Sequence, residues 1–155
     1  MYAFDSFQGL PEPRGVDSET TYTQFKRGEF RCSEEEFVNA MAARWVPREA
    51  YIVIPGWFEE TLTPDLYDQI NLQKAAIVWI DSDLYESAKV ALRWVRPLLQ
   101  DGSLIIFDDY YCYKGNPHFG EQRAFKEFLA ENPELEVTDY ARFSSVGQAF
   151  IVHPK

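Results

Sequence analysis

Three aspartates follow apolar segments of the sequence, at positions where parallel sheets carry their chemistry. Asp81 comes directly after the run 75–80, and Asp108 and Asp109 come directly after the run 103–107. In open parallel sheets, ligands bind beyond the carboxyl ends of the strands. If these two strands are neighbours, the three carboxylates converge. Like charges at such short range raise one another's pKa unless a cation neutralises them.

A hard divalent cation such as Mg²⁺ suits this set, because it takes oxygen ligands and keeps positions open for water or substrate. Such an ion can bind a substrate hydroxyl, lower the pKa of that hydroxyl and hold it in place. The alternative is that these aspartates cap the helices that follow them. Asp83, directly before Leu84, suits the capping role better than Asp81 does. At this point both interpretations stay open.

Other reactive side chains give weaker signals. The two histidines, His118 and His153, have no partners at the spacing of a zinc site. We expect His118 to lie in a surface loop and His153 in a solvated tail. Cys112 has no evident base beside it, and the sequence has no Gly-x-Ser-x-Gly elbow for a nucleophilic serine.

The elements that must position the three acids alternate between strand and helix. Ser33 and Glu36 have the spacing of a capping box, and Pro47 ends the helix that follows. Further predicted strands cover residues 2–4, 51–54, 75–80, 103–107, 135–140 and 148–153, and further predicted helices cover 64–70, 84–99 and 119–132. This order predicts an α/β fold with a mostly parallel sheet and a C-terminal antiparallel hairpin, in one domain over residues 1–155.

Composition narrows the function classes. Acids outnumber bases by 25 to 15, and the formal net charge of −10 argues against nucleic acid and anionic membranes as partners. No run approaches the ~20 apolar residues that span a bilayer, and the N-terminus lacks the features of a signal peptide. The two cysteines are too few for a disulfide framework, so we expect reduced thiols and a cytoplasmic protein.

Six blocks, in order, resemble the macrocin O-methyltransferase family of class I methyltransferases, which have a Rossmann-like fold. The blocks are residues 4–11 (FDSFQGLP), 28–30 (GEF), 55–62 (PGWFEETL), 81–87 (DSDLYES), 102–110 (GSLIIFDDY) and 120–128 (GEQRAFKEF). The resemblance implies transfer of a methyl group from S-adenosylmethionine to a hydroxyl of a small-molecule acceptor, often a sugar on a natural product.

The resemblance also implies roles for individual residues. Mg²⁺ would be held by Asp81, Asp108 and Asp109, and Asp81 is the candidate catalytic base. A carboxylate beside a metal-bound hydroxyl can accept its proton as the methyl group arrives.

A second set of residues is implied to bind the cofactor. Asp5, at the end of its strand, matches the acid that bonds the ribose hydroxyls, and Ser6 follows it. Gly56, Trp57 and Phe58 match the segment that borders the adenine, where an aromatic ring supplies an apolar wall.

The sequence departs from the family at the glycine-rich loop. Family members carry an earlier strand and helix joined by that loop, but no two glycines here have Gly-x-Gly spacing. The missing strand would lie between the strands that end at Asp5 and Asp81. The sheet then closes the gap, borrows a strand from another chain, or leaves a hydrophobic slot.

Three functions therefore remain. The first is an O-methyltransferase whose N-terminal part is absent from this chain. The second is an inactive module for binding or assembly, in which exposed strand edges favour a homodimer or another partner. The third, metal-assisted hydrolysis, is the weakest, because no phosphate-gripping loop is present.

Overall fold

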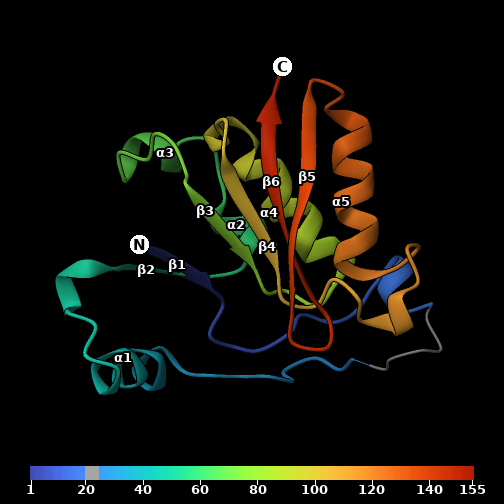
Figure 1. Ribbon diagram of the computed structural model, residues 1–155. Helices are drawn as coiled ribbons and strands as arrows, with labels where there is room; N and C mark the ends of the chain where they lie inside the picture. Colours follow the sequence, from blue (N-terminus) through green and yellow to red (C-terminus); the bar gives the residue numbers. More distant parts are fainter. Residues whose placement is uncertain (20–24) are drawn as a thin grey trace.

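The computed structural model describes residues 1–19 and 25–155, in which six strands form two separate sheets (Figure 1). A two-stranded sheet pairs β1 (Tyr2–Asp5) with β2 (Ile52–Pro55). A four-stranded sheet has the order β3-β4-β6-β5, with bounds Ile77–Ile80, Ser103–Phe107, Gly147–Pro154 and Leu135–Phe143. The α/β class and the order of strands and helices predicted from the sequence are confirmed.

The larger sheet combines a parallel pair with an antiparallel hairpin. β3 and β4 run parallel with Ile80 opposite Phe107, so that Asp81 and Asp108 follow neighbouring strand ends. β6 is antiparallel to both β4 and β5. The predicted neighbour relation of the two acid-bearing strands and the predicted hairpin are therefore both confirmed.

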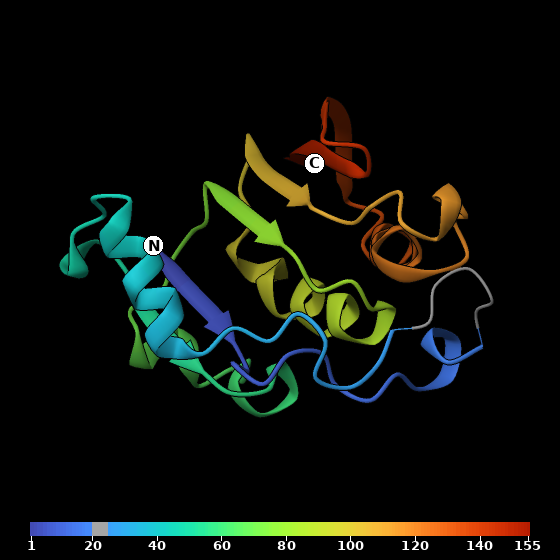
Figure 2. The same ribbon diagram turned by 90° about the horizontal axis from the view of Figure 1, so that it is seen from below.

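Two helices cover one face of the larger sheet (Figure 2). They are α4 (Tyr85–Val95) and α5 (Gly120–Glu131), which pack against each other. Between helices and sheet lies a core in which Ile105, Phe107 and Phe125 are at most 1% exposed. On the opposite face of β3, Ile77 is 61% exposed and Trp79 is 57% exposed. The sheet therefore has one covered face and one bare apolar patch.

Three short helices lie around the smaller sheet. The capping box of Ser33 and Glu36 is confirmed, and it starts α1 (Glu34–Ala43). α1 ends before Pro47, because Trp45 adopts a positive φ of 61°. α3 (Leu66–Gln69) is shorter than predicted, and α2 (Phe58–Thr61) was not predicted. The remaining turns are 3-10 helices at Gly15–Asp17, Arg48–Ala50, Arg96–Leu98 and Tyr113–Gly115.

The start of α4 is capped from a distant segment. The alternative role of Asp83 as the cap of this helix is not observed, because the N-cap is Leu84 and there is no side-chain hydrogen bond from that residue. Instead the buried Asp17 accepts hydrogen bonds from the backbone N–H groups of Tyr85 (2.8 Å) and Glu86 (3.1 Å). A carboxylate from the first twenty residues thus satisfies donors that a helix start leaves free.

The two sheets are joined by side chains and not by backbone hydrogen bonds. Among the described residues, β1 pairs only with β2, and β3 pairs only with β4. Figure 2 shows β1 and β3 pointing the same way with no strand drawn between them. Phe4 of β1 contacts Trp94 of α4 with ring centroids 5.2 Å apart, and Val78 of β3 packs against the same cluster. Direct pairing of β1 with β3, one of the three predicted outcomes, is therefore not observed, and a shared side-chain cluster connects the two strands.

Candidate functional site

Two loops that the sequence carries far apart meet beside the end of β1. The backbone of Leu10 donates to Glu29 O (2.9 Å) and accepts from Gly28 N (2.9 Å). Gly9 has φ +80°, and a Cβ there would lie 2.5 Å from Glu29 O. Only glycine allows this close approach of two backbones. Two of the sequence blocks, 4–11 and 28–30, thereby form one wall.

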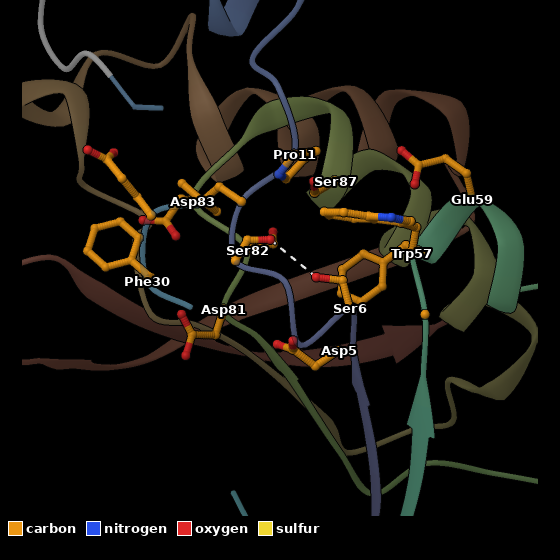
Figure 3. A pocket seen from close by; sticks show the side chains of 15 residues that line it. Asp5, Ser6, Pro11, Phe30, Trp57, Glu59, Asp81, Ser82, Asp83 and Ser87 are labelled. Carbon is orange, nitrogen blue, oxygen red and sulfur yellow. Dashed lines mark hydrogen bonds between the residues drawn. The ribbon is translucent and has the colours of Figure 1, made fainter. Parts of the chain in front are cut away.

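A pocket of about 170 Å³ lies at the carboxyl ends of the strands of both sheets (Figure 3). Trp57 and Glu59 stand along one side, and Phe30, Asp81 and Asp83 stand along the other. The pocket is lined by Asp5, Ser6, Gly9, Leu10, Pro11, Glu29, Phe30, Gly56, Trp57, Phe58, Glu59, Asp81, Ser82, Asp83 and Ser87.

The five residues predicted to bind a cofactor all line this pocket: Asp5, Ser6, Gly56, Trp57 and Phe58. Asp5 Oδ1 accepts from the N–H of Phe7 at 2.5 Å, and Ser6 Oγ donates to Gly9 O at 3.2 Å (Figure 3). These bonds fix the turn after β1. Gly56 has φ +137°, which lets the chain turn into α2 directly after β2.

Two acids of the pocket, Asp81 and Asp83, form a cluster with Asp109, and this cluster differs in one member from the predicted set. Ligand oxygens of Asp81, Asp83 and Asp109 all lie within 4.8 Å of one another. Asp108 stands outside this group, although its charge still acts on Asp81. Sequence reasoning therefore missed Asp83 as a cluster member, and the Asp-Ser-Asp spacing at 81–83 is the signal that could have found it.

Asp83 reaches the cluster through a tight turn. Its φ is +56°, a left-handed conformation that aspartate tolerates better than most residues. The N–H of Leu84 donates to Ser82 O at 2.5 Å, which closes a turn of three residues. The chain thus reverses at Asp83 before α4 begins.

Two carboxyls of the cluster, those of Asp81 and Asp83, hold protons more tightly than isolated aspartates. Desolvation raises the pKa of Asp81 to about 6, and the charges of Asp108, Asp109 and Asp5 add to this effect. Desolvation also raises the pKa of Asp83 to about 7, with Asp109 the largest charge effect. A cation in the cluster would reverse these shifts, because it favours the charged carboxylates.

Polar groups around the cluster are tied to it. The thiol of Cys112 donates to Asp109 Oδ1 at 3.1 Å, and burial raises the pKa of this thiol to about 12. Cys112 is therefore a protonated donor and not a nucleophile. Glu121 lies in the family-like block 120–128 but is not among the predicted site residues; it is fully buried, and burial raises its pKa well above its usual range.

The histidines lie apart from the pocket. His118 is exposed in a turn, as expected. His153 belongs to β6, where its ring Nδ1 lies 2.9 Å from Asp101 Oδ1, so the expectation of a solvated tail is wrong.

Comparison with known proteins decides the family. The family described as Macrocin-O-methyltransferase (TylF) matches residues 1–138. The chain belongs to the macrocin O-methyltransferase family. A relative from Streptomyces olivaceus, "8-demethyl-8-(2,3-dimethoxy-alpha-L-rhamnosyl)-tetracenomycin-C 4'-O-methyltransferase", is 32% identical over 114 residues, which are 71% of this chain and 41% of the relative. The "Demethyldecarbamoylnovobiocin O-methyltransferase" of Streptomyces niveus is 29% identical over 113 residues, again 71% and 41%.

Solved structures show the same fold for this family member. The O-methyltransferase NovP superposes with a TM-score of 0.72 at 24% identity, over 97% of this chain and 58% of NovP. The calicheamicin methyltransferase CalS11 gives 0.70 at 22% identity, over 97% and 59%. The fold is thus that of Rossmann-like class I methyltransferases. The chain spans less than half the length of the curated relatives it matches.

Within the described residues, none of the helices combines the length and the apolar character needed to span a membrane.

Proposed function

We propose that this chain takes part in transfer of a methyl group from S-adenosylmethionine to a hydroxyl of a glycosylated natural product, assisted by Mg²⁺. The observation that carries the proposal is that the predicted cofactor residues line the same pocket as Asp81 and Asp83, two members of the acidic cluster. Both curated relatives are named as O-methyltransferases, and one name describes a rhamnosyl-bearing molecule. Family membership supports the same reaction for this chain.

The pocket residues fit the adenosine part of the cofactor. The carboxylate of Asp5 would accept hydrogen bonds from the ribose hydroxyls, with the turn at Ser6 fixed by its own bonds. Trp57 and Phe58 supply apolar surface for the adenine, and Gly56 lets the backbone approach it. S-adenosylmethionine, when bound, supplies an electrophilic methyl group.

The acidic cluster fits Mg²⁺. Its donor set consists of carboxylate oxygens, which are the ligands this ion prefers. We propose that Asp81 and Asp109 hold the ion, that Asp83 joins them, and that Asp108 adds negative charge beside them. Mg²⁺, when bound, lowers the pKa of a coordinated hydroxyl.

Asp81 has the chemistry of the base in this reaction. Its carboxylate would accept the proton of the acceptor hydroxyl, and S-adenosylmethionine, when bound, would supply the methyl group to that oxygen. The pKa of Asp81 is about 6 without a cation, and a bound Mg²⁺ would lower it, so the group is ionised at neutral pH and can take a proton.

The 155 residues supply part of a larger binding unit in this proposal. The pocket of about 170 Å³ is smaller than the roughly 300–1,000 Å³ usual for ligand sites. The strands β1 and β3, whose carboxyl ends meet this pocket, are not paired with each other, and 41% coverage of the relatives supports the same interpretation.

Calorimetric titration with S-adenosylhomocysteine tests the proposal. We expect binding that Mg²⁺ strengthens and that Asp5→Ala weakens at least about tenfold, since a hydrogen bond to a charged group contributes about 1.5–3 kcal/mol. Asp65→Ala, which removes an exposed aspartate outside the pocket, is the matched control. Equal affinity for the Asp5→Ala and Asp65→Ala variants would contradict the assigned cofactor site.

One observation favours a second candidate, an inactive module for binding or assembly. Ile77 and Trp79 expose apolar surface beside the unpaired edge of β3, which suits a homodimer or another protein partner. The same titration separates the two candidates. Tight cofactor binding by this chain alone argues against the module, whereas no binding with or without Mg²⁺ argues for it.

A further inference from the structure

One buried carboxylate links the two loops that carry the acidic cluster. Glu121, the second residue of α5, has 0% exposure. Its Oε1 accepts from the N–H (3.1 Å) and the hydroxyl (3.4 Å) of Ser82, and its Oε2 accepts from the N–H of Asp109 (3.1 Å). Ser82 stands between Asp81 and Asp83. The backbone of both acid-bearing loops is therefore anchored on a single side chain.

The link begins where the strand ladder ends. The last backbone hydrogen bond between the two strand ends runs from Asp108 N to Ile80 O, at 3.0 Å. Beyond it, no backbone bond joins residues 81–84 to residues 109–111, all of which the structure describes. Beyond that bond, where the cluster begins, the side chain of Glu121 holds the two chain segments together.

The local sequence directs Glu121 into this position. Gly120 has φ +55°, and a Cβ there would lie 2.5 Å from a ring carbon of Tyr113. Glycine therefore lets α5 begin directly against that ring. Further along α5, Phe125 is buried in the core and fixes the helix on the sheet. The first turn of α5 is thus held beneath the two loops.

A carboxylate is an unfavourable group to bury beside other acids, which makes its presence informative. Burial and the charges of Asp109 and Asp83 all oppose ionisation of Glu121. A glutamine of the same length has one carbonyl acceptor, and its NH₂ group would face the second backbone N–H. Accepting from both loops requires a carboxyl group.

We infer, on the basis of the proposed function, that Glu121 is a positioning residue that sets the spacing of Asp81, Asp83 and Asp109 for a divalent cation. Glu121 contacts the backbone of the cluster and not the cation. Partners of this kind orient metal ligands, and their removal typically weakens metal affinity about 10–100-fold.

Mn²⁺ binding, followed by electron paramagnetic resonance at pH 8, tests the inference with the chain alone. We expect Glu121→Gln, which keeps length and loses an acceptor, to bind Mn²⁺ about 10–100-fold more weakly than the unaltered chain. Glu121→Asp keeps the acid and loses the reach, so it should also bind weakly; it serves if the first variant fails to fold. Hydrogen exchange at the Ser82 and Asp109 amides should accelerate in both variants.

Glu127→Gln is the matched control, because Glu127 lies on the same helix and bonds the hydroxyl of Tyr85 at 2.6 Å, outside the cluster. Its Mn²⁺ affinity should equal that of the unaltered chain. Unchanged affinity in both Glu121 variants would overturn the inference and leave the proposed function intact. If the unaltered chain binds no Mn²⁺, the metal role is overturned. If amide exchange at Ser82 and Asp109 is then faster only in the Glu121 variants, Glu121 anchors the two loops and has no role in metal binding.

Discussion

At the scale of single residues, the chain keeps several acids close together without a basic side chain in their midst. The causes that shift the pKa values of Asp81 and Asp83 are all unfavourable to the charged form. Such a cluster lowers the stability of the metal-free fold at neutral pH. Cation-binding sites tolerate this loss of stability, because the free energy of binding the ion exceeds the repulsion among the carboxylates.

Desolvation and the neighbouring negative charges together predict that Asp83→Asn changes the stability of the fold in a pH-dependent way. The folded pKa of about 7 exceeds the ordinary value of 3.8, so the folded state holds a proton that the unfolded state has released. This carboxyl contributes its full stability below the ordinary value and loses it as pH rises through about 7. In chelator, Asp83→Asn should therefore gain stability over the unaltered chain progressively across this window.

Urea unfolding at several pH values measures the difference. Asp65→Asn removes an exposed aspartate outside the pocket, and its difference from the unaltered chain should not grow over the same window. A constant difference for Asp83→Asn would contradict the assigned desolvation. With saturating Mg²⁺ the order should invert at pH 8, because the carboxylate then gains a partner.

The sequence located most of the acids, and the reason for the exception is local. Asp81 and Asp109 follow strands, and strand ends are predictable from apolar runs. Asp83 depends on a positive φ and on a turn of three residues, so the Asp-Ser-Asp spacing alone does not establish that its side chain joins the cluster. Glu121 depends on how closely α5 approaches Tyr113, a property of packing alone.

At the scale of elements, α4 depends on a residue far from it in sequence. Asp17→Ala should lower the free energy of unfolding by about 2 kcal/mol, because two N–H groups at a buried helix start lose their acceptor. Urea unfolding monitored by circular dichroism gives the value. Ser18→Ala, at an exposed hydroxyl next in sequence, should change stability by less than about 0.5 kcal/mol. Similar losses in both variants would refute the cap.

Element boundaries were predictable where a local signal sets them. The capping box at Ser33 starts α1 as expected, and Asp101-Gly102 precedes β4 at the predicted residue. α2 is a single turn without a side-chain cap, so no local sequence signal predicted it. Asp17 caps α4 through a tertiary contact, so the residues next to the helix start could not identify this cap.

At the scale of the whole molecule, the bare face of β3 predicts self-association. Unpaired strand edges and exposed apolar patches both favour contacts between chains. Trp79→Lys should lower the sedimentation coefficient of concentrated samples toward that of a monomer, because it places a charge in the patch. Analytical ultracentrifugation over a concentration series is the measurement.

Trp45→Lys is the control for that experiment. Trp45 is 93% exposed but lies just beyond α1, away from β3. Its substitution should leave sedimentation unchanged. If Trp79→Lys and the unaltered chain sediment alike while association persists, the contact surface lies elsewhere.

The cluster around Trp94 has a consequence for how wide the pocket is. Asp5 and Trp57 follow strands of one sheet, and Asp81 follows a strand of the other. Trp94 touches Phe4 from the first sheet, and Val78 from the second packs on the same cluster. The packing of this apolar cluster, which lies behind the pocket, thus sets the distance between the cofactor residues and the acids.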